Sequence, residues 1–296
     1  MEIRKAERKK SKLRLGLAAP SGAGKTYSAL KMAFGIGGKV GMIDTEAGSG
    51  DLYAHLGDYD IIQVDAPYSV EKYRKAINLF ESSMYSVIVI DSLSHAWAGD
   101  GGLLDKQGKI ADRGTNSFSA WRTITPEHNQ LVEAMLSSPC HIIATMRSKQ
   151  EYVLETNDKG KQTPKKVGMA PVQREGMEYE FTVMLDIDMH HIASASKDRT
   201  SLFDGRFFKI DEKTGGELRE WLESGAEVAA PKIDEPEGLP WLTEKLADKW
   251  VSAKSAYKRD NNFDAILKRM RLSDENKALI KNQVADDKFN KEDAPL

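Results

Sequence analysis

The stretch that most constrains the fold is residues 13–30, LRLGLAAPSGAGKTYSAL. An apolar run ends at Ala19, a glycine-containing turn follows, and Lys25-Thr26 opens a helical pattern. This order of strand, turn and helix fits the phosphate-loop pattern G-x-x-x-x-G-K-[ST], except that Ala19 replaces the first glycine. The stretch therefore predicts an α/β protein that binds a nucleotide at the turn.

The residue types of this turn suit a chain of phosphates. Gly22 and Gly24 let the backbone turn its N–H groups inward, and the helix N-terminus adds partial positive charge. Lys25 is expected to reach the β- and γ-phosphates, and the Thr26 hydroxyl is expected to hold Mg²⁺. The predicted nucleotide-binding residues are Ser21, Gly22, Ala23, Gly24, Lys25, Thr26 and Tyr27.

Composition excludes several classes of protein. The chain has 296 residues and a net charge of −2, so any nucleic-acid contact must come from a local basic surface. No apolar run approaches transmembrane length. The single cysteine, Cys140, rules out an internal disulfide and is compatible with a reducing compartment. We therefore expect a cytoplasmic protein without membrane contact.

Two further predicted strands end in acidic residues. Residues 39–43 lead into Asp44-Thr45-Glu46, and residues 87–90 lead into Asp91. Ligands of doubly wound sheets bind at the carboxyl ends of the strands. Glu46 is therefore a candidate to orient an attacking water, Asp44 could assist the metal shell, and Asp91 is predicted to hold Mg²⁺. The alternative is that these acids are ordinary turn residues.

The other predicted strands and helices complete the core. Residues 141–145 read as a buried strand, and Arg147 after it is either a γ-phosphate sensor or a surface arginine. A helix is expected to start at Thr125-Pro126, with proline at its first position. Other predicted strands are residues 61–64, 179–187, 191–196 and 207–210, another predicted helix is residues 67–82, and residues 215–222 close the core.

Two segments have the composition of DNA-contacting loops. Residues 98–119 are rich in glycine, and residues 147–175 carry several lysines together with Gly160 and Gly168. Mobile basic loops suit contact with a phosphate backbone. The first segment also leaves room for one short helix. The alternatives are a plain surface connection for the first segment and, for the second, a solvated β-hairpin with its turn at residues 157–160.

Near the end of the predicted core, Lys197 and Arg199 lie two residues apart. On an extended chain they would face the same side, which suits paired phosphate contacts within the subunit or across a subunit interface. The alternative is a charged turn. The adjacent His190 and His191 would point to opposite faces of a strand, so we do not expect them to share a metal.

The chain reads as four regions. Residues 1–12 form a basic N-terminal arm, 13–223 the core, 224–240 a proline-containing linker, and 241–296 a helical tail. The arm is either a frayed terminus or a contact for nucleic acid or a neighbouring subunit. The tail is either a packing appendix or a partner-binding module.

Taken in order, the motifs GKT, IDTE, VIVIDS and HIIAT resemble the RecA-type ATPase core over roughly residues 10–225. The resemblance implies a mainly parallel sheet flanked by helices, with ATP and Mg²⁺ bound between subunits of a homo-oligomer. It also implies that Glu46 is the catalytic acid and Asp91 the Walker B carboxylate. Lys197 and Arg199 resemble cations that some RecA-type subunits insert into a neighbour's ATP site. The implied catalytic residues are Lys25, Glu46, Lys197 and Arg199, and the implied metal ligands are Thr26 and Asp91.

More narrowly, residues 145–152 (TMRSKQEY) and 174–181 (REGMEYEF) resemble short phage RecA-like ATPases linked to single-strand annealing and recombination. This likeness implies ATP hydrolysis in DNA recombination, with single-stranded DNA and a single-strand-binding or annealing protein as partners. No residue after HIIAT clearly matches the polar sensor of RecA-type proteins. The alternative function is an ATP-gated adaptor or loader that holds a replication or recombination protein through the tail.

Overall fold

A computed structural model describes residues 3, 5–114, 116–156, 162–226, 240–260 and 262–292. The chain divides into two compact units, Met1–Val228 and Ala229–Leu296. Among the described residues, no helix has the length and apolar character needed to cross a membrane.

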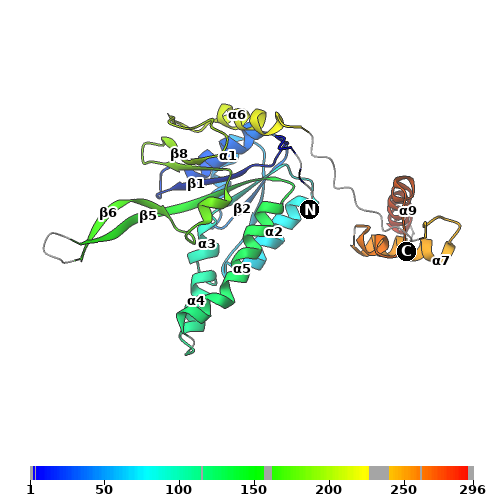
Figure 1. Cartoon of the computed structure of the whole chain (residues 1–296). Coiled ribbons are helices and arrows are strands. Elements are labelled where there is room, and N and C mark those ends of the chain that lie inside the picture. Colours follow the sequence, from blue (N-terminus) through cyan, green and yellow to red (C-terminus); the bar gives the residue numbers. More distant parts are fainter. Residues whose placement is uncertain are drawn as a thin grey trace. The chain divides into compact units, whose positions relative to one another are not determined.

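The described residues of the first unit build a nine-stranded sheet in the order β3-β2-β4-β5-β1-β7-β8-β9, with β6 paired to β5 (Figure 1). The strands from β3 to β7 along this order run parallel, whereas β6, β8 and β9 pair antiparallel. The predicted α/β fold with a mainly parallel sheet is therefore confirmed. The strands are β1 (Arg14–Ala19), β2 (Val40–Asp44), β3 (Asp60–Gln63), β4 (Val87–Asp91), β5 (His141–Thr156), β6 (Gln162–Pro171), β7 (Val183–Ile187), β8 (Ala193–Asp198) and β9 (Phe207–Phe208).

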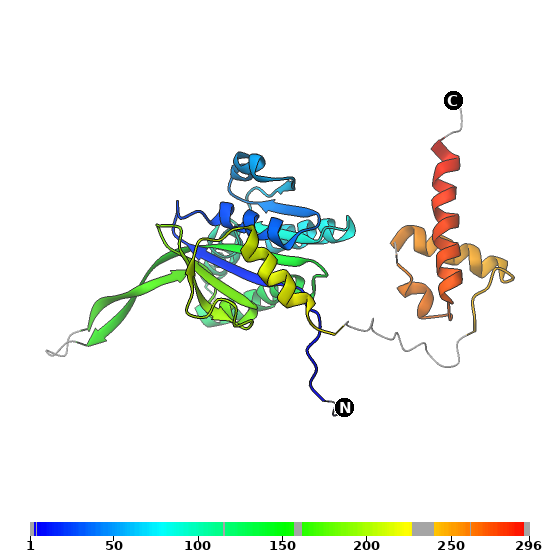
Figure 2. The same ribbon diagram turned by 90° about the horizontal axis from the view of Figure 1, so that it is seen from above.

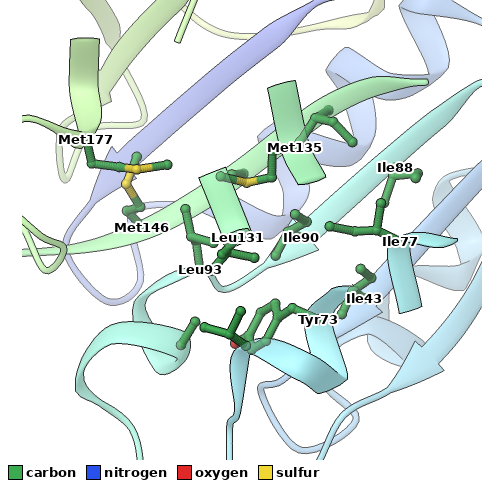
Figure 3. Close-up of a cluster of buried hydrophobic side chains, with 14 of the residues drawn as sticks. Ile43, Tyr73, Ile77, Ile88, Ile90, Leu93, Leu131, Met135, Met146 and Met177 are labelled. Atoms are coloured by element: carbon green, nitrogen blue, oxygen red, sulfur yellow. The ribbon is translucent and has the colours of Figure 1, made fainter. Parts of the chain in front are cut away.

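Helices cover both faces of this sheet (Figures 1 and 2). α1 and α6 pack on one face, where Val87 and Val89 of β4 join their apolar side chains. α2 and α5 pack on the other face, where Ile88 and Ile90 point, as Figure 3 shows. This alternation along β4 follows from the two-residue period of a strand. The helices are α1 (Lys25–Ile36), α2 (Val70–Ser82), α3 (Ser94–Ala98), α4 (Leu103–Ala111), α5 (Ser117–Ser137) and α6 (Glu212–Glu223), with short 3₁₀ turns η1 (Ser49–Leu56) and η2 (Met177–Glu180).

The glycine-rich segment 98–119, expected to be a flexible loop with at most one short helix, is more helical than its composition predicts. It contains α4 and the start of α5, and Asn116 caps α5 by accepting a hydrogen bond from the Ser119 N–H at 2.8 Å. Pro126 therefore lies inside α5 instead of opening it. An interior proline costs about 3 kcal/mol. The buried face of α5, which includes Ala120, Ile124, Leu131 and Met135, offsets that cost.

Residues 147–175 follow the hairpin alternative. β5 continues beyond the sheet and pairs with β6, from Ser148 opposite Pro171 to Thr156 opposite Gln162. This hairpin projects from the sheet in Figure 1. The expected turn at residues 157–160 lies outside the described residues. The strand predicted over 179–187 begins later, at Val183, because η2 occupies residues 177–180.

The second unit has a core of its own. α7 (Ala247–Asp260), α8 (Asp264–Leu267) and α9 (Asp274–Glu292) surround a cluster of buried apolar side chains. The Trp250 indole N–H also donates to the Gln283 side-chain oxygen at 2.9 Å, which ties α7 to α9. The cluster contains Leu242, Trp250, Ala253, Ile266, Met270, Leu272, Ile280 and Val284.

A polar clamp fixes the amino end of β1 against the start of β5. The buried Arg14 guanidinium donates to the backbone oxygens of Cys140 at 2.7 Å and Ser138 at 2.5 Å. The Leu13 N–H donates to His141 Nδ1 at 3.1 Å. Burial, with the nearby positive charges of Lys12 and Arg14, lowers the pKa of His141 to about 4. His141 therefore accepts its hydrogen bond as a neutral ring.

This lowered pKa predicts a loss of stability in mild acid. Between pH 6.5 and about 4 the unfolded chain binds a proton at His141 that the folded chain does not. The free energy of unfolding should therefore fall with decreasing pH, by up to about 1.4 kcal/mol per pH unit from this group. His141→Asn keeps an acceptor for Leu13 but cannot titrate, so its unfolding free energy, measured by urea denaturation, should fall less steeply. His55→Asn, at an exposed position, is the matched control, and equal slopes for wild type and His141→Asn would contradict this prediction.

Candidate functional site

The phosphate loop joins β1 to α1 at the carboxyl edge of the sheet. Gly22 and Gly24 have φ values of 82° and 85°, in the left-handed region that favours glycine. A Cβ atom on Gly24 would also lie 3.3 Å from His191 Nδ1. The Lys25 ammonium donates to the Pro20 backbone oxygen at 3.2 Å, and burial lowers its pKa although Asp91 and Glu46 oppose the shift. The loop therefore brings the positive charge of Lys25 and the N-terminus of α1 to the same place.

Asp91, at the end of β4, is the most buried acid facing this loop. Its two carboxylate oxygens accept hydrogen bonds from the hydroxyl groups of Thr26 and Thr145, each at 2.5 Å. Burial raises the pKa of Asp91, and these two donors partly offset that shift. The Thr26 hydroxyl and the Asp91 carboxylate thus lie together beside the loop. The oxygens of Thr26 and Asp91 are suitable ligands for Mg²⁺, which usually takes one or two protein oxygens in addition to phosphate oxygens and water.

Glu46 lies across the site and is paired with Arg147 of β5. Arg147 Nε donates to Glu46 Oε1 at 3.0 Å, and its Nη2 bonds to Oε2, which makes a two-point ion pair. Burial alone would raise the pKa of Glu46. The hydrogen bonds and charge of Arg147, with a contribution from His95, outweigh burial, so the pKa lies below its ordinary value. Glu46 is therefore held as a carboxylate at a fixed position.

Asp44 occupies a different position from the one expected for a metal ligand. It is fully buried, and its carboxylate accepts from the Glu46 N–H at 2.6 Å and from the Gly50 N–H at 3.0 Å. Both oxygens are used to shape the loop that carries Glu46. Asp44 therefore positions the neighbouring acid.

Thr45 ties this loop to the end of β4. Its hydroxyl accepts from the Ser92 N–H at 2.8 Å and lies 2.8 Å from His95 Nδ1. The Thr45 N–H donates to the Asp91 backbone oxygen at 2.7 Å. The Tyr68 ring stacks on His95 with centroids 4.7 Å apart. Glu46 and Asp91, which are 45 residues apart in sequence, are consequently held on one rigid frame.

The phosphate loop, Glu46, Asp91 and Arg147 line a cavity of about 560 Å³, a size that suits a small-molecule ligand. The cavity brings together most of the predicted site residues, from the loop and from the ends of β2 and β4. Ala23 is buried in the loop, and the Tyr27 ring is half-exposed and outside the lining. The predicted site residues that line the cavity are Ser21, Gly22, Gly24, Lys25, Thr26, Glu46 and Asp91.

Several residues around this cavity were not predicted from sequence, among them Thr145, His191 and Tyr53. Thr145 could have been noticed as the polar residue that ends the apolar strand HIIAT, the position searched for a sensor. His191 Nδ1 lies 3.1 Å from the Ala23 backbone oxygen, in the turn after β7. Tyr53 of η1 lines the cavity. No local signal marks His191 or Tyr53, because both reach the site through the tertiary fold.

Lys197 and Arg199 lie elsewhere. Both donate to the Tyr179 backbone oxygen, so they do face the same side. Lys197 stands opposite Met184 near the amino end of β7. Since β7 runs parallel to β1, this is the edge of the sheet opposite the phosphate loop. Within one subunit these two cations therefore lie away from the cavity.

A family model described as an AAA domain matches residues 11–221, which span the sheet, the phosphate loop and the cavity. No curated protein matches the chain.

The Glu46–Arg147 pair makes a direct prediction. Arg147→Met removes the hydrogen bonds and the charge that lower the pKa of Glu46, while burial, which raises that pKa, remains. The pKa of Glu46 should therefore be higher in this variant than in the wild type. A ¹³C NMR titration of the glutamate carboxyl groups measures it, with Glu46→Gln to assign the signal. Lys149→Met, an exposed change of the same type on the same strand, should leave the signal unshifted, and an unshifted Glu46 in Arg147→Met would contradict the prediction.

Proposed function

Because the chain belongs to the AAA domain family, we propose that it is a RecA-like ATPase that hydrolyses ATP to ADP and phosphate while bound to single-stranded DNA. We place it in DNA recombination or single-strand annealing, with a phage origin as the sequence resemblance implies. The phosphate loop, the paired Thr26 and Asp91, and the fixed Glu46 carboxylate support the hydrolytic part. The hairpin of β5 and β6 supports the DNA-binding part.

The charged residues of the cavity and Thr26 have the following roles in this proposal. Lys25 and the loop N–H groups bind the β- and γ-phosphates. Thr26 and Asp91 would hold Mg²⁺, which neutralises charge on the phosphates. Glu46, ionised because of Arg147, orients a water molecule toward the γ-phosphorus and accepts its proton as the bond to the β–γ bridging oxygen breaks. Positioning and electrostatics supply most of the rate enhancement in such a site.

The observation that carries the DNA proposal is the continuity of β5. Within a few residues this strand contacts Asp91 through Thr145 and Glu46 through Arg147, and then leaves the sheet as the hairpin. A change at the γ-phosphate that moves Arg147 therefore acts on the first residue pairs of the hairpin. The hairpin sequence includes Lys149, Lys165 and Lys166, which suit a phosphate backbone.

We also propose that the chain assembles into a homo-oligomer, which the position of Lys197 and Arg199 supports. They lie at the edge of the sheet opposite their own phosphate loop. In a head-to-tail assembly that edge meets the phosphate loop of the next subunit. The two cations would then stabilise the charge of the transferred phosphoryl group in a neighbouring site.

Arg199→Ala tests this arrangement. It should lower kcat on the order of 10³-fold while ATP affinity changes less than about twofold. Arg113→Ala, at an exposed position, is the matched control. Mixing Arg199→Ala with Lys25→Ala should restore part of the activity, because some interfaces then combine an intact Lys25 with an intact Arg199. Normal turnover by Arg199→Ala alone would contradict the role, and no recovery on mixing would contradict its action between subunits.

Coupling to DNA is tested by the rate of ATP hydrolysis with and without single-stranded DNA, at low and moderate salt. We expect stimulation of tenfold or more that weakens as salt rises, because phosphate contacts release counterions. Replacing Lys165 and Lys166 with glutamine should remove the stimulation and leave the DNA-free rate unchanged. Replacing Lys72 and Lys75 of α2 with glutamine controls for net charge, and Lys25→Ala controls for contaminating activity.

A rate that is indifferent to DNA would favour the adaptor or loader alternative. The specific observation behind that alternative is the separate core of the helical unit. Deleting residues 241–296 separates the two functions, since an adaptor would lose its partner and a recombination ATPase would keep DNA-stimulated hydrolysis.

A further inference from the structure

The helical unit contains a groove of about 750 Å³ that does not belong to the nucleotide site. α7 and α8 form its walls, together with Leu242 and the residues that follow α8. Its floor is apolar and includes the buried side chains of Leu242, Ile266 and Met270. Three alanines, Ala253, Ala256 and Ala265, line it as well, and their small side chains leave the space open.

The rim of the groove is cationic. Lys249, Lys268 and Arg269 line it and are exposed to solvent. Arg259 also lines it, but its guanidinium pairs with the carboxylate of Asp260 at 2.7 Å. Within the part of the chain that the structure describes, no carboxylate pairs with Lys249, Lys268 or Arg269. These three charges are therefore available to a ligand.

The sequence around the groove also has an excess of positive charge. Residues 247–271 contain seven lysines and arginines against three aspartates, in a chain whose net charge is −2. The positive charge is thus concentrated on the elements that form the groove. An anionic ligand would be attracted to this part of the surface.

We propose that the groove binds an acidic peptide segment of a partner protein, with one large apolar side chain of the peptide seated on the floor. Carboxylates beside that side chain would pair with Lys249, Lys268 and Arg269. The apolar floor would bury a hydrophobic side chain of the peptide, whereas a phosphate backbone has no such group to bury. A single-stranded nucleic acid would instead need aromatic side chains for base stacking, and none of the groove's lining residues is aromatic.

The chemistry of the groove also sets the expected strength of binding. Exposed ion pairs are individually weak and are screened by salt. The cations therefore provide selection for acidic sequences, and the apolar contact provides most of the affinity. We expect micromolar dissociation constants that rise several-fold between 50 mM and 300 mM salt.

The test uses the full chain and a fluorescein-labelled twelve-residue peptide made of aspartate, glutamate and two leucines, with binding followed by fluorescence anisotropy. The double variant Lys268→Glu/Arg269→Glu should raise the dissociation constant at least tenfold. Ala265→Trp, which fills the groove from an exposed position, should do the same without altering its charge. The double variant Lys245→Glu/Lys258→Glu makes the same change of net charge outside the groove lining and should bind like wild type.

Two further probes define what the groove selects. A peptide with serine in place of leucine should bind at least tenfold more weakly, and a labelled oligothymidylate should be insensitive to Lys268→Glu/Arg269→Glu. All variants should hydrolyse ATP at the wild-type rate, so a failure here is separate from a failure of the ATPase proposal.

Three results would overturn the proposal. The first is a peptide dissociation constant that is unchanged in Lys268→Glu/Arg269→Glu and in Ala265→Trp. The second is equal binding of the leucine and serine peptides, which would show only general attraction of anions. The third is loss of self-association in the groove variants without peptide, measured by sedimentation, which would assign the groove to a second copy of the chain.

Discussion

The buried carboxylate of Asp91 is the interaction on which the site depends. It ends the central strand β4, and its two oxygens are shared between Thr26 of the phosphate-loop helix and Thr145 of β5. Three elements that are far apart in sequence are thereby fixed around one buried acid. A buried carboxylate is costly unless it is hydrogen-bonded or paired with a cation. The fold thus maintains, at the point where β1 and β4 end and β5 leaves the sheet, an anionic group suited to a divalent cation, while the loop beside it suits phosphates.

A second layer of hydrogen bonds gives Glu46 the same fixed position. Asp44 accepts hydrogen bonds from the backbone of the loop that carries Glu46, and Thr45 attaches this loop to Ser92 and to the Asp91 backbone. Arg147 forms an ion pair with the Glu46 carboxylate. Because Arg147 belongs to the strand that becomes the hairpin, the water-orienting acid and the projecting hairpin share one structural element. This shared strand gives the proposed coupling between hydrolysis and DNA a physical route.

How much could be predicted from sequence depended on how local each signal was. The strands around Ile43, Val89 and Ile143 were predictable because parallel strands buried on both faces read as continuous apolar runs. The grouping of Lys25, Glu46 and Asp91 followed from the rule that carboxyl ends of parallel strands meet at one edge. The start of α5 was missed because Pro126 reads as the first position of a helix, whereas it lies inside α5, where packing on the core outweighs its cost. The position of His191 beside Ala23 of the phosphate loop depends on a tertiary contact that no local pattern records.

The place of β1 in the sheet has a consequence for how the protein is made. β1 carries the phosphate loop near the start of the chain, but its two neighbours, β5 and β7, begin at His141 and Val183. During synthesis the nascent chain therefore emerges with its phosphate-loop strand unpaired on both edges until most of the first unit has left the ribosome. Such an apolar strand is exposed to wrong pairing for that whole interval. Competence to bind nucleotide is thus acquired only after the partner strands have emerged, although the motif responsible precedes them in the chain.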